Sequence, residues 1–139
     1  MPYPKELIRG ISNQDFLDEA GTVQIDAFNF DNEREDYKEM SINWYDDEGA
    51  LHQIFQQKKS ESDEFQFKGG AAIIPSNKLK QLCISTTVNG DLCYERSQLP
   101  TNSYHGNILC TRSLNRKRVA MLRSGLALMV TRIEKRHES

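Results

Sequence analysis

Apolar and polar residues are patterned along several short segments in the way that β-strands require. Strands are expected where apolar side chains alternate with polar ones, or form short runs bounded by turn residues. On this basis the sequence predicts strands over residues 6–11, 22–30, 41–46, 64–75 and 104–110, and a hairpin over 84–97. The hairpin is expected to turn at Asn89-Gly90, the dipeptide that best accommodates a tight type I′ turn. A change of parity within 22–30 predicts a bend near Asp26 or Ala27.

Other segments carry apolar residues at helical spacing. Leu51, Ile54 and Phe55 stand at i, i+3 and i+4, with acidic residues before them and lysines after them, which predicts an amphipathic helix over 46–60. A short helix is expected over 76–83, and a helical turn or loop over 12–21. The longest stripe advances by three or four residues at a time and predicts a helix from about Leu114 to Lys135. Its members are Val119, Leu122, Leu126, Met129 and Ile133.

The order of these elements indicates the fold class. Strands and helices do not alternate as βαβ units, so the sequence predicts an α+β fold. We expect a mainly antiparallel sheet, a long C-terminal amphipathic helix packed on one face, and one or two shorter helices. With 139 residues, the chain is expected to form a single domain over 1–139.

Charge is distributed unevenly, although the net charge is only −2. Between residues 31 and 48, eight acidic residues stand against Arg34 and Lys38, which gives −6. Between residues 111 and 139, eight basic residues stand against Glu134 and Glu138, which gives +6. The basic segment contains the candidate nucleic-acid or anion-binding residues Arg112, Arg116, Lys117 and Arg118. Positive charge at the start of a helix opposes the helix dipole, which makes an external anion a more natural partner for it.

Composition limits the cellular compartment of the protein and the chemistry expected of its cysteines. No apolar run approaches the roughly 20 residues of a membrane span, and the first ten residues lack the apolar stretch of a secretory signal. We therefore expect a cytoplasmic protein that does not contact membranes. Cys83, Cys93 and Cys110 form no C-x-x-C pair and are expected to be free thiols; a zinc site with His105 or His52 is the alternative. No metal or cofactor is expected.

The motifs of nucleotide-binding loops, zinc proteases and serine hydrolases are absent from the sequence. One polar stretch, LPTNSYHGNILC, remains as a candidate functional site. Pro100 and Asn102 are typical of a turn, and His105 follows that turn at the start of an expected strand. His105 either fastens the loop by hydrogen bonds to main-chain groups, or it contacts a ligand or acts as a general base. Glu95 and Arg96 would lie beside it if their strand pairs with 104–109.

The order of short motifs resembles a set of small uncharacterised bacterial proteins, some encoded beside predicted phage-defence or conflict-system genes. The shared motifs are Leu7-Ile8-Arg9, Gly21-x-Val23 leading to Ala27-Phe28, Ser41 at the start of a strand, and Pro100-x-Asn102-x-x-His105-x-x-Ile108. The resemblance spans about residues 7–110 and departs at Ser103 and Gly106. It implies a prokaryotic cytosolic protein, an accessory component of a defence cassette, and it groups Arg9, Ser41 and His105 as candidate catalytic residues.

Three functions are consistent with these observations. The leading hypothesis is a non-catalytic accessory or protein-interaction component, whose partner is a larger protein encoded nearby or a second copy of this chain. The first alternative is nucleic-acid binding through the basic C-terminal helix. The second alternative is a small enzyme, or a binder of a nucleotide ligand, that uses Arg9, Ser41 and His105.

Overall fold

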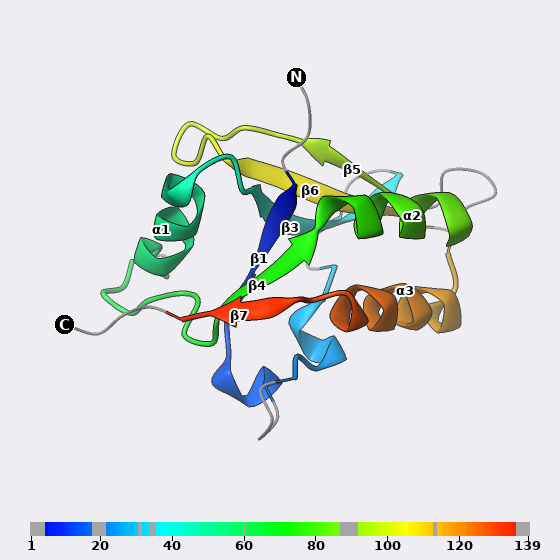
Figure 1. Cartoon of the computed structure of the whole chain (residues 1–139), viewed down its shortest axis with the longest axis horizontal. Helices are drawn as coiled ribbons and strands as arrows, with labels where there is room; N and C mark the ends of the chain where they lie inside the picture. Colours follow the sequence, from blue (N-terminus) through cyan, green and yellow to red (C-terminus); the bar gives the residue numbers. More distant parts are fainter. Residues whose placement is uncertain are drawn as a thin grey trace.

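The computed structural model describes residues 5–17, 22–30, 32–33, 36–59, 61–86, 92–112 and 114–135. Three helices flank a seven-stranded sheet in which all the pairings described are antiparallel (Figure 1). The elements follow in this order: β1 (Glu6–Ile11), η1 (Gln14–Phe16), η2 (Ile25–Ala27), β2 (Asn32–Glu33), β3 (Tyr37–Trp44), α1 (Glu48–Gln56), β4 (Gly70–Pro75), α2 (Ser76–Thr86), β5 (Leu92–Arg96), β6 (His105–Thr111), α3 (Arg116–Leu128) and β7 (Arg132–Glu134). The architecture is therefore α+β.

The strands lie in the order β5-β6-β3-β1-β4-β7, and β2 pairs with β3 outside this path. In the centre of the sheet, Ser41 of β3 is opposite Asn107 of β6, and Asn43 is opposite His105. Side chains that are opposite each other in neighbouring strands point to the same face of a sheet. This register places several polar side chains of β3 and β6 on one face.

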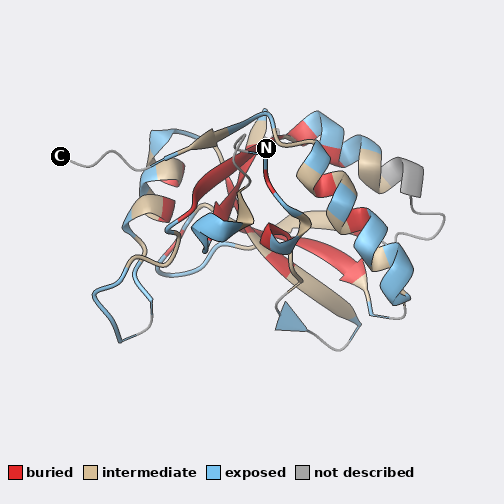
Figure 2. Ribbon diagram, turned by 90° about the horizontal axis from the view of Figure 1, so that it is seen from below, coloured by how far each residue is buried: buried red, intermediate tan, exposed pale blue. Residues whose placement is uncertain are grey.

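Each face of the sheet has its own hydrophobic core, and the two cores have different partners (Figures 1 and 2). Alternation along each strand sends successive side chains to opposite faces, so the strands contribute to both cores. The larger core lies between the sheet and helices α2 and α3, to which Leu79, Leu122 and Leu126 belong. The smaller core lies under α1, where Ala50 and Ile54 pack on Ile8 and Ile73.

The prediction of a long C-terminal helix was wrong. Helix α3 has 13 residues and ends at Leu128, and the chain then forms β7 on the edge of the sheet. The backbone N–H of Thr131 donates to the carbonyl of Ile73, which holds the chain against β4. Ile133, expected on the helix stripe, lies instead in β7 opposite Ala72. Val130, Thr131 and Ile133 are β-branched, so a strand suits them better than a helix when a free sheet edge is available.

Gly70 permits the close approach of β7 to β4. Its φ of +101° is a conformation that other residues rarely adopt, and a Cβ atom there would lie 2.6 Å from the carbonyl oxygen of Glu134. The expected strand over 64–75 is correspondingly shorter, since β4 begins only at Gly70.

Two further predicted elements differ from the structure. Residues 84–86, expected as the first strand of a hairpin, belong to helix α2, and the Asn89-Gly90 turn lies outside the described residues. Helix α2 thus continues for three residues beyond the predicted end at residue 83, since each residue added to an existing helix gains a backbone hydrogen bond. The segment 22–30 forms η2 rather than a strand, with Val23 in an isolated bridge to Leu17.

The helix predicted over 46–60 is present as α1. Asp47 caps its N-terminus by accepting a hydrogen bond from the backbone N–H of Gly49 at 2.8 Å. Its buried residues are Ala50 and Ile54, while Leu51 and Phe55 are half-buried. Among the helices in the described part of the chain, none is long and apolar enough to cross a membrane.

Candidate functional site

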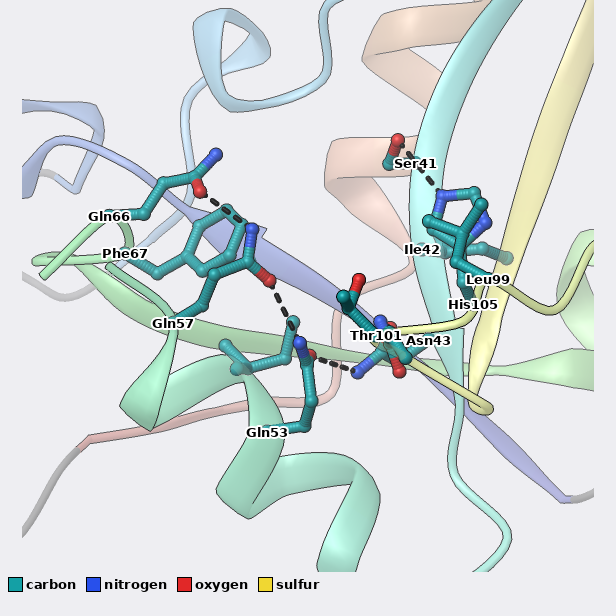
Figure 3. A pocket seen from close by; sticks show the side chains of 13 residues that line it. Ser41, Ile42, Asn43, Gln53, Gln57, Gln66, Phe67, Leu99, Thr101 and His105 are labelled. Atoms are coloured by element: carbon teal, nitrogen blue, oxygen red, sulfur yellow. Dashed lines mark hydrogen bonds between the residues drawn. The ribbon is translucent and has the colours of Figure 1, made fainter. Parts of the chain in front are cut away.

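A pocket of about 340 Å³ lies between α1, the central strands and the loop that joins β5 to β6 (Figure 3). We call it the amide pocket because carboxamide side chains form much of its wall. Its lining residues are Gly10, Ser41, Ile42, Asn43, Gln53, Ile54, Gln57, Gln66, Phe67, Leu99, Thr101, Asn102 and His105. None of these residues is Asp, Glu, Lys or Arg, so the pocket offers hydrogen bonds and apolar contacts but no formal charge.

The loop between β5 and β6 is folded by its own sequence. Leu99 and Asn102 exchange two backbone hydrogen bonds of 3.0 Å, and the Asn102 side chain accepts from the backbone N–H of Tyr104 at 3.0 Å. This is the turn that Pro100 and Asn102 predicted. The turn places Thr101 and Asn102 at the pocket.

Two contacts tie this loop to the start of α1. The hydroxyl of Tyr104 donates to the carboxylate of Asp47 at 2.8 Å, and Arg96 forms an ion pair with Asp46 at 2.5 Å. Because Asp47 also caps α1, its carboxylate holds the β5–β6 loop against the start of α1, the two elements that form opposite walls of the pocket. The pocket is therefore fixed by contacts among residues that are far apart in the sequence.

Five carboxamides are hydrogen-bonded head to tail along one wall of the pocket, and we call them the carboxamide row. Asn102 donates to Asn43 at 2.8 Å, and Asn43 donates to Gln53 at 3.1 Å. Gln53 donates to Gln57 at 3.0 Å, and Gln57 donates to Gln66 at 2.6 Å. Figure 3 shows the row running from Asn43 to Gln66, with Phe67 beside its far end. From Asn43 onward, each oxygen accepts from the N–H of the preceding carboxamide, and the oxygen of Asn102 accepts from the backbone N–H of Tyr104. These contacts set the orientation of every amide in the row.

His105 and Ser41 lie together at the pocket. His105 Nδ1 is 2.8 Å from the carbonyl oxygen of Ser97, which can only accept, so Nδ1 carries the proton. In the tautomer with its proton on Nδ1, Nε2 accepts a hydrogen bond, and it lies 3.3 Å from Ser41 Oγ. His105 is half-buried and is the first residue of β6. Its ring thus fastens the loop and also lines the pocket.

Arg9 is not part of this site. It is 8% exposed, and its guanidinium donates to the backbone carbonyls of Ala27, Asn29 and Ser41. By the alternation of β1, its side chain lies on the face opposite to Gly10, which lines the pocket. The structure therefore brings Ser41 and His105 together and gives Arg9 a separate position, where it holds η2 and the residues after it.

The basic candidate residues lie elsewhere as well. Arg116, Lys117 and Arg118 are exposed in the first turn of α3, whose N-cap is Asn115. The side chain of Arg112 reaches β2, where it forms an ion pair with Glu33 at 3.5 Å. None of the four lines the amide pocket.

In the described part of the chain, the cysteines and histidines are not arranged as a metal site. Among the described residues, no group of three or more His, Cys, Asp or Glu side chains is placed to hold a metal ion. Cys83, Cys93 and Cys110 are free thiols. Burial raises the pKa of Cys83 to about 12 and raises that of Cys110 as well, so both thiols are protonated at neutral pH.

The sequence did not predict the carboxamide row, because no motif marks its members. Gln53 and Gln57 stand at i, i+4, the spacing at which two glutamines on a helix reach each other. Asn43, Gln66 and Asn102 carry no such local signal, because they reach the pocket from a strand and two loops. The glutamine pair beside the apolar stripe of α1 was the one signal available.

No protein-family model matches the chain, and no curated protein or solved structure is significantly similar to it.

Proposed function

We propose that this protein is a non-catalytic recognition module that binds an uncharged, hydrogen-bonding group in the amide pocket. The observation that carries the proposal is the composition of the pocket wall: polar side chains without formal charge line it together with Phe67, Ile54 and Leu99. Small-molecule pockets commonly combine apolar walls with a few fixed polar groups that set the orientation of the ligand.

The fixed geometry of the wall supports binding. Asn43 is 2% exposed and Asn102 is 8% exposed, and both are held by hydrogen bonds within the protein. A side chain whose orientation is fixed before binding loses little conformational entropy when the ligand arrives. The carboxamide row therefore presents its remaining N–H groups in set directions.

The proposal is tested by NMR titration of the labelled protein with a set of uncharged polar fragments. Binding in the pocket is expected to shift the backbone signals of residues 41–43, 53–57, 66–67 and 101–105. A fragment set that shifts none of these signals at millimolar concentration would contradict the proposal.

A pair of variants provides the control. Thr101 is exposed and lines the pocket, so Thr101→Trp is expected to block the entrance and abolish the shifts. Ser103 is exposed in the same loop and does not line the pocket, so Ser103→Trp is expected to bind normally. Equal loss in both variants would indicate that the loop, and not the pocket, was altered.

Hydrolysis is a second candidate function, favoured by the contact between Ser41 and His105. Because Nδ1 is bonded to Ser97, Nε2 is oriented to take the proton of the Ser41 hydroxyl. Incubation with a fluorophosphonate tests this candidate. Labelling of Ser41 that disappears in His105→Ala would favour hydrolysis. Absence of labelling at Ser41 would rule hydrolysis out.

The wider role rests on the resemblance alone. A cytoplasmic accessory component of a prokaryotic defence system, acting with a larger protein encoded nearby, is consistent with a small recognition module. A pull-down of the tagged protein from its own host tests this role, with Thr101→Trp as the variant expected to lose a partner that enters the pocket.

A further inference from the structure

Strand β7 forms one edge of the sheet. It pairs with β4 on one side, and no described strand pairs with its other side. Successive residues of a strand direct their backbone N–H and C=O groups to alternate sides, so β7 keeps backbone groups that point away from β4. Figure 1 shows β7 running from the end of α3 towards α1. Such an edge can pair with a further strand through backbone hydrogen bonds.

A hollow lies beside this edge on each face of the sheet. On the face of the smaller core, a hollow of about 520 Å³ is bounded by Glu134 and by the half-buried Leu51 and Phe55 of α1. On the face of the larger core, a hollow of about 250 Å³ is bounded by Val130 and Ile133. The side chains of an added strand point alternately to the two faces. Both hollows therefore have room for the side chains of a strand placed next to β7.

The side chains of β7 separate charge from apolar surface. Arg132 and Glu134 are opposite residues of the smaller core, whereas Ile133 belongs to the larger core. The two charged side chains therefore lie on the face that carries α1, and the apolar side chain between them lies on the face that carries α3.

The charges of β7 are self-complementary. When this strand pairs antiparallel with its own copy about Ile133, Arg132 lies opposite the partner's Glu134, and Glu134 lies opposite the partner's Arg132. Opposite charges that face each other across antiparallel strands attract. Among the described residues, Arg132 uses three of its five N–H groups on Glu6 and Glu134, and Glu134 accepts from it through Oε1. The remaining N–H groups of the guanidinium and Oε2 of the carboxylate are left for a partner.

We propose that two copies of this chain associate by antiparallel pairing of their β7 strands, which joins the two sheets into one. The twofold axis passes through Ile133, which meets the partner's Ile133 on the face of the larger core. On the other face, the partner's Arg132 enters the hollow beside Glu134, and its alkyl stem covers Leu51 and Phe55. No residue of β7 lines the amide pocket, so the association is independent of the proposed recognition function.

Sedimentation velocity at several protein concentrations tests the association. The dimer fraction is expected to rise from micromolar to millimolar protein, as mass action requires. Over the same range, the NMR signals of residues 131–135 are expected to shift, while those of residues 92–96 in β5, the other edge of the sheet, stay in place. A monomer at every concentration, or shifts confined to residues 92–96, would overturn the proposal.

Charge reversal tests the register of the two strands. An Arg132→Glu chain has two acidic residues on this edge and a Glu134→Arg chain has two basic residues, so neither is expected to pair with its own copy. When the two variants are mixed, each acidic residue lies opposite a basic one, and heterodimers are expected. Arg116→Glu, the same substitution in the exposed first turn of α3, is the control and is expected to dimerise as the parent does.

Mixing also separates association from stability. Each single variant breaks the ion pair between Arg132 and Glu134 within its own chain, and mixing cannot repair a defect within one chain. The double variant Arg132→Glu/Glu134→Arg keeps an ion pair between the two positions and a self-complementary edge, so it is expected to dimerise with itself. Melting curves establish which variants fold. Dimers of a folded single variant alone, or a folded double variant that stays monomeric, would overturn the proposal.

Discussion

At the scale of single residues, His105 links the start of β6 to the residues just after β5 and to the middle of β3. Its ring contacts the carbonyl of Ser97 and the hydroxyl of Ser41, and its backbone pairs with Asn43. A half-buried imidazole that satisfies both nitrogens in this way stabilises the loop whether or not a ligand is bound. The His105 side chain can therefore fasten the loop and contact a ligand at the same time.

His105→Ala is expected to lower the free energy of unfolding by about 1–3 kcal/mol, because two hydrogen bonds worth about 0.5–1.5 kcal/mol each are lost. Ser41→Ala removes one of these bonds and is expected to cost about 0.5–1.5 kcal/mol. Urea unfolding measures both values. A His105→Ala variant as stable as the parent would show that the ring does not fasten the loop.

The Cys83 thiol is expected to react slowly with iodoacetamide at pH 8 in the folded protein and quickly in urea. Burial raises its pKa from 9.0 to about 12, so almost none of the reactive thiolate is present. Between those two pH values the folded state holds a proton that the unfolded state has lost, so this thiol makes stability fall as pH rises from about 9 towards 12. Mass spectrometry of the alkylated protein gives the rate, and rapid native labelling of Cys83 would contradict the expectation.

At the scale of elements, α3 is tied to the sheet by the inner half of its apolar stripe. Leu122 and Leu126 are buried in the larger core, and Arg123 donates to the backbone carbonyls of Phe28 and Ile25. Met121 and Leu128 face outward and are exposed. Gly125 allows close contact with Leu82 of α2, where an added Cβ atom would lie 3.4 Å away.

Leu126→Ala is expected to lower the free energy of unfolding by about 2–5 kcal/mol, because its side chain is fully buried and a cavity would remain. Leu128→Ala is the matched control: the same change two residues along the same helix, at a side chain that is 85% exposed, is expected to cost less than about 0.5 kcal/mol. Denaturant titration measures both. Equal costs for the two variants would contradict the packing of α3 on the sheet.

At the scale of the whole molecule, the acidic and basic segments meet rather than remain apart. Residue 112 follows β6, which pairs with β3, and the ion pair between Arg112 and Glu33 links the two segments. The pair is about half exposed, so it contributes at most about 1 kcal/mol. The remaining basic residues at the start of α3 keep nucleic-acid binding as an untested prediction.

Replacing Arg116, Lys117 and Arg118 together by Ala separates that prediction from the pocket. None of the three lines the amide pocket, so the fragment-induced shifts of the pocket signals are expected to be unchanged in the triple variant. If α3 contacts a nucleic acid, affinity for a single-stranded oligonucleotide is expected to fall between about 50 and 200 mM salt in the parent, and less steeply in the variant. Titrations at both salt concentrations measure this, and loss of the fragment-induced shifts in the triple variant would contradict the placement of the site.

The sequence by itself determined the elements whose patterns lie within a few neighbouring residues and favour a single conformation. The stripe of Leu51, Ile54 and Phe55, with acidic residues before it and lysines after it, predicted α1. The turn at Pro100-Asn102 followed by His105 predicted the loop before β6. In each case the local signals agree with one another: spacing and charge for α1, and turn-forming residues for the loop. Neighbouring residues are therefore enough to select the conformation.

Only the tertiary structure decided the end of α3 and the composition of the pocket. Residues 129–135 are compatible with a helix by spacing and with a strand by composition, and the free edge of β4 selects the strand by satisfying its backbone hydrogen bonds. The carboxamide row draws on a strand, a helix and two loops, and its hydrogen bonds join residues up to 59 positions apart. Such contacts exist only once the sheet has brought those segments together, which is why no local pattern in the sequence predicted them.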